Sequence, residues 1–431
     1  MKRRDFLRYT IPSVLLPSVM PGFSLRALLA SPFTAAHVPG GSDRVLVLIQ
    51  LSGGNDGLNT VIQLEFYEAY QAARSNIAIP QNKILALDGY DKTGLNPAMP
   101  EMQHLFDAGK LTIVQGVSYP QPNFSHFRAT DIWLTGADPG QVLSTGWAGR
   151  YLDEQYPRFP EDYPNAAMPD PLAIQVGSLV SPALQGPALT MGMAISNPAS
   201  FYDLINDKPG AVPDTRAGDQ IAYIREMSIK TDQYAGVIRN AAQKVAKQSD
   251  KYPATGKNPL ADQLKIVARL VAGGLRTKIY LVSMGGFDTH ARQTEANDTT
   301  TGNHAKLLAK LSEAIGAFQD DLAFLQIADR VMGMTFSEFG RRIRSNASGG
   351  TDHGAAAPVF IFGNSVMPGI VGDNPVLPVN ATVNDNIAMQ HDFRAIYAAL
   401  LEKWFQTDPG VAASILLKSY PVLPLVRSLP V

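Results

Sequence analysis

Buried strands and amphipathic helices alternate along this chain. The clearest strand signal is the largely apolar run at 45–51 (VLVLIQL), because β-branched and leucine side chains in series are typical of a strand covered on both faces. Apolar positions recur at helical spacing over 307–322 and 393–404. The same patterns predict further strands and helices, at 111–116, 172–176, 278–283, 330–336 and 358–362 for strands and at 99–107 and 125–134 for helices.

Strands that alternate with helices predict an α/β fold with a mostly parallel central sheet and helices on both faces. The region 182–259 departs from this pattern, since it is polar, begins with loops and has a helical pattern at 219–247. We expect it to be a helical insertion packed over one end of the sheet. The prediction is therefore a single domain, 37–431, that carries this insertion.

The first 36 residues have the features of an export signal. Arg3 and Arg4, followed by Phe6 and Leu7, match the twin-arginine pattern, and a weakly apolar stretch follows at 9–30. Three prolines interrupt that stretch, which argues against a membrane-spanning helix. We therefore expect export through the twin-arginine translocase, which carries folded proteins, and a periplasmic or secreted location.

Composition limits the kinds of partner and metal ligand that the protein can have. Lys and Arg number 37 and Asp and Glu 38, so the chain has no basic surplus of the kind that marks nucleic-acid binding. The absence of cysteine excludes disulfides and thiolate metal sites. Any metal ion must therefore be held by histidine, carboxylate or hydroxyl groups.

Polar motifs follow the predicted strands at the ends where α/β sheets place ligands. Groups of this kind are costly to desolvate, so several of them at strand ends indicate an active site more than a structural role. Carboxylates and imidazoles also suit two divalent ions such as zinc, manganese or magnesium, which can clamp the attacking and leaving oxygens of a displacement. The motifs are Asn55-Asp56, Ser125-His126, Asp288-Thr289-His290, Ser337-Glu338 with Arg341 and Arg342, and Asp352-His353.

Longer motifs carry a family resemblance over nearly the whole chain. They are LSGGNDGLNT (51–60), NFSHF (123–127), TGWAGRYLD (145–153), GGFDTH (285–290), FSEFGRR (336–342), GTDHG (350–354) and HDFRAIY (391–397). With these motifs, the chain resembles a bacterial family of twin-arginine-exported proteins of unknown function. That family is itself similar to the alkaline phosphatase and sulfatase-like superfamily.

The resemblance implies a role for each matching residue. Ser125 corresponds to the hydroxyl nucleophile that opens a helix, and Arg150 would hold the non-bridging oxygens of the substrate. The metal ligands implied are Asp56, Asp288, His290, Asp352, His353 and His391.

This sequence departs from the superfamily pattern in three places. Asp288 and His290 stand closer together than the corresponding pair in alkaline phosphatases. His304 is a second candidate for the late ligand assigned to His391. The sulfatase signature is missing, which argues against formylglycine-dependent sulfate cleavage.

Each residue also has a structural interpretation. Asp56 could stabilise a tight turn, and Ser125 could cap a helix. His126 more often packs or bonds to backbone than binds metal, and Arg150 could form a surface salt bridge. Glu338 could pair with the arginines of its own motif.

We expect an exported, metal-dependent hydrolase of an anionic ester, most simply a phosphoester, that uses a serine nucleophile. The alternative from another class is a non-catalytic exported binding or cell-surface protein that retains the fold. A transferase or mutase would use the same residues, whereas an esterase of the nucleophile-elbow kind is disfavoured because no G-x-S-x-G motif occurs. The number of metal ligands separates the first two functions: a missing third ligand at the first metal site would favour a binding protein without turnover.

Overall fold

The structure is a computed structural model that describes residues 43–196 and 234–428. The residues from Asp43 onward form one compact unit. The predicted signal segment, 1–36, lies outside the described residues, as does part of the predicted helical stretch at 219–247. Within that stretch, residues 234–244 are helical.

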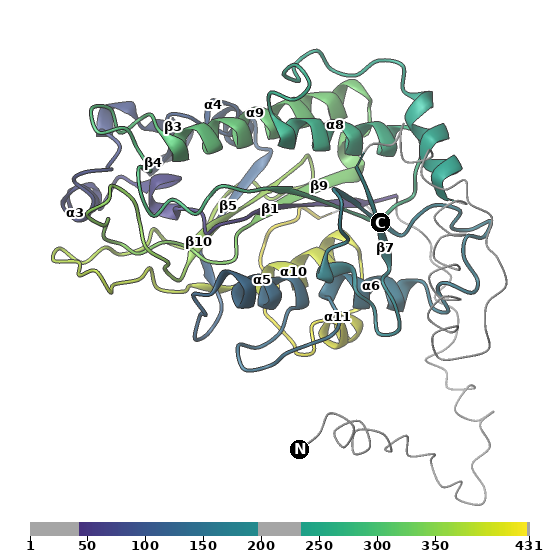
Figure 1. The fold of residues 1–431 in the computed structure, drawn as a ribbon. Helices are drawn as coiled ribbons and strands as arrows, with labels where there is room; N and C mark the ends of the chain where they lie inside the picture. The colour runs from purple at the N-terminus through teal and green to yellow at the C-terminus, as the bar shows by residue number, and fades with distance from the viewer. Residues whose placement is uncertain (1–42, 197–233, 429–431) are drawn as a thin grey trace, which may run out of the picture. The chain divides into compact units, whose positions relative to one another are not determined.

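A mixed sheet of nine described strands runs through the middle of this unit (Figure 1). Its order is β11-β5-β10-β9-β1-β8-β6-β7, with β12 paired to β5. Only β10 runs antiparallel to its neighbours among these strands, so the sheet is mostly parallel. The strands are β1 Val45–Leu51, β5 Leu111–Ser118, β6 Ala173–Val176, β7 Gly192–Ile195, β8 Ile279–Met284, β9 Val331–Phe336, β10 Ala357–Phe362, β11 Gly369–Val371 and β12 His391–Asp392.

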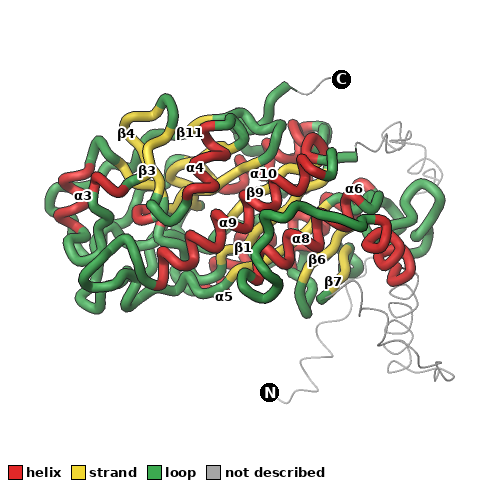
Figure 2. The backbone as a smooth tube through the Cα atoms, turned by 90° about the horizontal axis from the view of Figure 1, so that it is seen from above, coloured by secondary structure: helices red, strands yellow, loops and turns green. Residues whose placement is uncertain are grey.

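Helices cover both faces of the sheet (Figure 1). One face carries α4 Pro100–Asp107, α8 Pro259–Ala272 and α9 Asn303–Phe324, and Figure 2 shows α8 and α9 lying over it. The other face carries α5 His126–Thr135, α6 Trp147–Gln155, α10 Phe393–Ala399 with the π-helical turn η6 Leu400–Trp404, and α11 Pro409–Ile415.

The alternation of side chains along β1 divides the core into two layers. Val47 and Ile49 belong to the apolar cluster under α8 and α9, whereas Leu46 and Leu48 belong to the cluster under α5, α6 and α10. Both sets are almost completely buried. A strand buried on both faces needs an unbroken apolar run, since successive residues point to opposite sides.

The predicted fold class, α/β with a mostly parallel sheet and helices on both faces, is confirmed. Strand β1 has the predicted bounds, β8 begins and ends one residue later than predicted, and β9 begins one residue later than predicted. Part of the predicted insertion joins the sheet, because β7 pairs with β6 in parallel. The chain also forms a small antiparallel sheet beside α3 Tyr67–Ala73, made of β2 Val61–Gln63, β3 Leu85–Leu87 and β4 Tyr90–Leu95.

Three neighbouring strands position the polar motifs. Strands β9, β1 and β8 are adjacent and parallel, so the loops at 52–57, 285–291 and 337–342 all leave the same edge of the sheet. None of the described helices is both long and apolar enough to cross a membrane.

Candidate metal centre

Asp288 lies at the centre of a polar cluster at this edge. Its Oδ1 accepts hydrogen bonds from Arg341 Nη2 and lies 2.7 Å from both that atom and His290 Nδ1. Two further imidazoles face the same carboxylate, His126 with Nε2 3.6 Å from Oδ2 and His353 with Nε2 3.4 Å from Oδ1. Burial raises the pKa of Asp288, but the hydrogen bond and the charge of Arg341 outweigh it and lower the pKa to about 2. The carboxylate is therefore ionised.

A buried carboxylate orients the His126 ring. His126 is the first residue of α5, and its Nδ1 lies 2.7 Å from Oε1 of Glu338, which also accepts the backbone N–H of Gly53 at 2.8 Å. Since a carboxylate only accepts, Nδ1 donates to Glu338. The other ring nitrogen, Nε2, faces Asp288.

A backbone carbonyl does the same for His353. Its Nδ1 lies 2.8 Å from the carbonyl oxygen of Phe124 and donates to it, so Nε2 again faces Asp288 with a lone pair. Burial lowers the pKa of His353 and favours this neutral ring. The ring centroids of His126 and His353 lie 4.5 Å apart, and Phe339 packs against both rings.

The cluster therefore brings together three atoms that can each bind a metal ion. One ligand atom from each of His126, Asp288 and His353 lies within 4.8 Å of the others. Metal–ligand bonds of 2.0–2.1 Å in a tetrahedral site put the donor atoms about 3.4 Å apart. His353 Nε2 lies 3.4 Å from Oδ1 of Asp288 and His126 Nε2 lies 3.6 Å from Oδ2, so each ring is at about this distance from one oxygen of the carboxylate. Histidine ligands whose second nitrogen donates to a carboxylate or a carbonyl are usual in such sites. These residues fit one divalent cation.

Arg341 connects the three loops through hydrogen bonds. Its side chain is fully buried, and it donates to the carbonyl oxygens of Gly53, Gly54 and Phe287 as well as to Asp288. Gly53 has φ 125°, and a Cβ there would lie 2.3 Å from the backbone nitrogen of Asp288. Close approach of these two loops therefore requires glycine at this position.

Two exposed groups border the cluster. The hydroxyl of Ser125 does not cap α5, although Ser125 is its N-cap residue and directly precedes His126. The His290 ring is 44% exposed, and its centroid lies 4.5 Å from that of His353. Both side chains are accessible to a substrate.

Asp56 is placed in a different environment. It is fully buried, and its two oxygens accept from Arg74 Nη1 at 2.8 and 2.6 Å and from Gln293 at 2.5 Å. Burial opposes ionisation of Asp56, yet the charge and hydrogen bonds of Arg74 hold its pKa below the usual value. The structure therefore gives Asp56 a structural ion pair, separate from the three-donor group.

Arg150 is not brought to the cluster. It donates to the carbonyl oxygens of Thr135, Thr145 and Ile415, which occupy its guanidinium. Thr135 ends the helix that His126 begins, about 13 Å along the axis. These hydrogen bonds join α6 to α5 and α11, and the anion-binding role expected of Arg150 remains a prediction.

The remaining predicted ligands also lie elsewhere. Asp352 is exposed and accepts from Asn346, since neighbouring residues of an extended segment point to opposite sides and His353 takes the inner one. His391 lies in β12 beside Gly372, next to β5. The rival candidate His304 is buried and lies 3.0 Å from Asn55 Oδ1, and burial lowers its pKa to about 4. The described residues contain one group of three ligands, not two.

His126, Glu338 and Arg341 are the site residues whose roles the sequence did not reveal. The His126 ring packs against Phe339 and His353 and hydrogen-bonds to Glu338, and it also supplies one of the three potential ligand atoms, a role the sequence did not suggest. Its partner Glu338 lies 212 positions later, and no local pattern links the two. The interpretation of Glu338 as a supporting residue agrees with the structure, although its partner is His126 and not an arginine.

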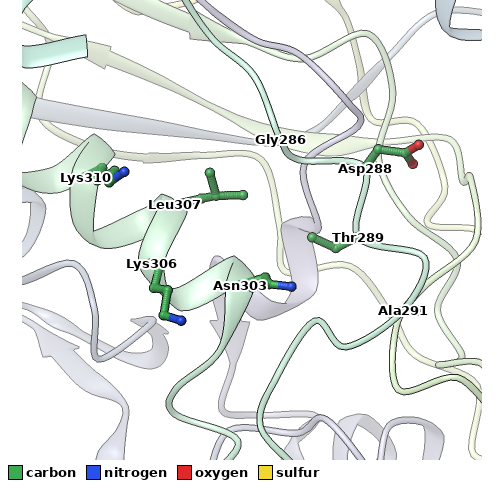
Figure 3. A pocket seen from close by; sticks show the side chains of 8 residues that line it. All are labelled: Gly286, Asp288, Thr289, Ala291, Asn303, Lys306, Leu307 and Lys310. Atoms are coloured by element: carbon green, nitrogen blue, oxygen red, sulfur yellow. The ribbon is translucent and has the colours of Figure 1, made fainter. Parts of the chain in front are cut away.

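A pocket of about 300 Å³ adjoins the cluster (Figure 3). Its wall on one side is the loop that carries Asp288 and on the other the first two turns of α9. The lining residues are Gly286, Asp288, Thr289, Ala291, Asn303, Lys306, Leu307 and Lys310.

The fold and site together define an α/β protein with a candidate metal centre at the carboxyl ends of its central strands. A family described as a protein of unknown function (DUF1501) matches residues 216–406, a span that includes Asp288, Arg341 and His353. No protein of curated function matches the chain.

Solved structures similar to the chain share little sequence with it. The zinc complex of the C-terminal periplasmic domain of EcEptC from Escherichia coli is 10% identical, with a TM-score of 0.36, over 76% of this chain and 74% of that one. A protein in the alkaline phosphatase superfamily from Vibrio parahaemolyticus is 13% identical, with a TM-score of 0.35, over 77% and 63%. The PsFucS1 sulfatase from Pseudoalteromonas sp. is 11% identical, with a TM-score of 0.34, over 76% and 64%. The chain thus spans less than two thirds of the length of the Vibrio protein and of the sulfatase. Sequence identities this low carry no information on activity.

Proposed function

We propose that the protein is an exported, metal-dependent hydrolase of an anionic ester, most simply a phosphoester. The observation that carries this proposal is the convergence of His126 Nε2 and His353 Nε2 on the ionised Asp288 carboxylate. Both rings donate through Nδ1 to other partners, so each directs Nε2 at Asp288, where a divalent cation would compensate the charge of the carboxylate.

Each residue of the cluster has a task in this reaction. A divalent ion held by His126, Asp288 and His353 would neutralise charge on the ester and favour ionisation of a nearby hydroxyl group. Ser125 would supply that hydroxyl, at a helix N-terminus whose free N–H groups favour an anion. Its oxygen forms a bond to phosphorus while the bond to the leaving oxygen breaks, and water then releases the phosphoryl group from Ser125. His290 would accept the hydroxyl proton, since it borders the cluster and is half exposed.

This proposal needs one ion, whereas the family resemblance implied two. The described residues supply a single set of three ligands. The export part of the proposal depends on the twin-arginine pattern at 2–8 and makes the translocase a partner during export. The substrate would accordingly be met outside the cytoplasm.

Metal content tests the proposal. We expect about one equivalent of metal in protein purified from the periplasm, and its loss in Asp288→Ala and in His353→Ala. Asp352→Ala is the matched control, because its carboxylate bonds to Asn346 outside the cluster, and should keep the metal. Circular dichroism would show that each variant is folded.

Activity then separates the two function classes. Hydrolysis of p-nitrophenyl phosphate by the wild type and its loss in Ser125→Ala would support the hydrolase. Bound metal without turnover of any phosphoester would favour the binding protein. Failure to take up zinc, manganese or magnesium would contradict both the metal centre and the reaction built on it.

A further inference from the structure

We propose that the pocket beside Asp288 binds a second anionic group of the substrate, so that the substrate is a polyanionic ester. This inference rests on the proposed function and names the class of molecule on which the site acts. It depends on four observations: the cavity, the charge of its lining, the helix face that forms its wall, and its junction with the metal centre.

The pocket presents positive charge. Lys306 and Lys310 line it and are exposed, and within the described part of the chain no carboxylate pairs with either ammonium group. Asn303, also exposed, adds an amide donor. Lysine is a common partner of phosphate groups, because its ammonium is a compact charge with three donors.

One face of α9 is left for this pocket. Positions 303, 306, 307 and 310 follow the spacing of a single helix face and all line the cavity, as Figure 3 shows. The opposite face, which includes Leu308 and Leu311, is buried in the core. On the pocket side Leu307 is partly buried against the core, whereas Asn303, Lys306 and Lys310 stay exposed.

Asp288 does not cancel the positive charge. Its carboxylate points away from α9 in Figure 3 and bonds to Arg341 on the far side of the loop. Only the lysines and Asn303 then offer charged or polar groups from α9 to an occupant of the pocket.

The pocket and the metal centre share Asp288. Its carboxylate faces His126 and His353, while the residue itself forms part of the pocket wall. A volume of about 300 Å³ is at the lower end of the range for small-molecule sites, so it holds an anionic group with part of the molecule that carries it. A substrate that occupies both would therefore reach around this loop, with its ester at the metal centre and its next anionic group in the pocket.

Binding of tripolyphosphate to metal-stripped protein tests the pocket directly by calorimetry. We expect binding to weaken at least 10-fold in Lys306→Gln/Lys310→Gln, since each exposed charge contributes about 1 kcal/mol, or roughly 5-fold. Lys403→Gln, an exposed lysine on the other face of the molecule, is the matched control and should bind as the wild type does. Equal binding by the double variant would overturn the site.

A second arm shows whether the anion belongs to the substrate. With metal-loaded enzyme, the double variant should raise KM for glucose 1,6-bisphosphate relative to glucose 6-phosphate by about 5-fold or more. An unchanged ratio would contradict the polyanionic substrate and leave a site for free anions. Lysine-dependent binding of tripolyphosphate by a protein that takes up no metal would reject the hydrolase alone, so the two proposals fail separately.

Discussion

At the scale of single residues, the site depends on groups that hold other groups in place. Glu338 fixes the proton of His126, the Phe124 carbonyl fixes that of His353, and Arg341 fixes Asp288. The sequence could predict Asp288 and His353, because they follow strands in polar, glycine-flanked motifs. It could not predict the groups that orient the two histidines, since the hydrogen bonds from His126 to Glu338 and from His353 to the Phe124 carbonyl each span more than 200 positions and leave no local pattern.

Glu338→Gln tests the positioning of His126. The amide oxygen can still accept from Nδ1, but the loss of negative charge makes the imidazole a weaker ligand, so we expect metal affinity to fall about 10-fold with the fold unchanged. Competition with a chelator measures this affinity. Glu154→Gln, at an exposed carboxylate of α6, serves as control, and equal affinities in the two variants would refute the positioning role.

Asp56 provides a second prediction at this scale. Because Asp56 and Arg74 form a fully buried ion pair, removing either charge leaves the other unpaired. We expect Asp56→Asn and Arg74→Met each to lower the free energy of unfolding by about 3–5 kcal/mol in urea titrations. The folded variants should still bind metal. Loss of metal from a stable Asp56→Asn protein would show that Asp56 is a ligand after all.

At the scale of elements, the long buried strands and helices followed from their hydrophobic patterns. Strand β1 is apolar on both faces, and α9 repeats its apolar positions over 22 residues. The antiparallel direction of β10 and the edge strand β7 did not follow, because pairing depends on distant partners and not on the strand's own residues. The loops that follow β1, β8 and β9 converge because these strands are neighbours and run parallel, which also depends on strand pairing.

Gly53→Ala tests how closely these loops must approach. A Cβ would collide with the backbone of Asp288 and Phe287 at a φ of 125°, so we expect a loss of about 3 kcal/mol or more together with weaker metal binding. Gly89→Ala is matched in having a positive φ of 75° but open space, and should cost only about 1 kcal/mol. Similar losses in the two variants, measured by urea unfolding, would argue against a close contact.

At the scale of the whole molecule, the formal charge of −1 gives no general attraction for anions. Any preference for an anionic substrate must therefore come from local charge, which is why the lysine face of α9 matters. The described residues bring together one group of three potential ligands, because residues that share a motif, such as Asp352 and His353, point in different directions. A second ion stays a prediction of the family resemblance.

Stability should depend on pH through His304. Burial lowers its pKa in the folded protein to about 4, against about 6.5 in the unfolded chain. The unfolded state thus takes up a proton first, and stability present above pH 6.5 is lost as the pH falls toward 4. We expect a loss of about 2–3 kcal/mol between pH 7.5 and 4.5 that His304→Asn largely abolishes. Parallel pH profiles for the two proteins would contradict the assignment.

The most direct test of the metal centre is anomalous diffraction from crystals of the zinc-loaded protein. The account predicts one strong peak about 2.0–2.2 Å from His126 Nε2, His353 Nε2 and an oxygen of Asp288. A peak at Asp56, Asp352 or His391, or no peak among these residues, would contradict it.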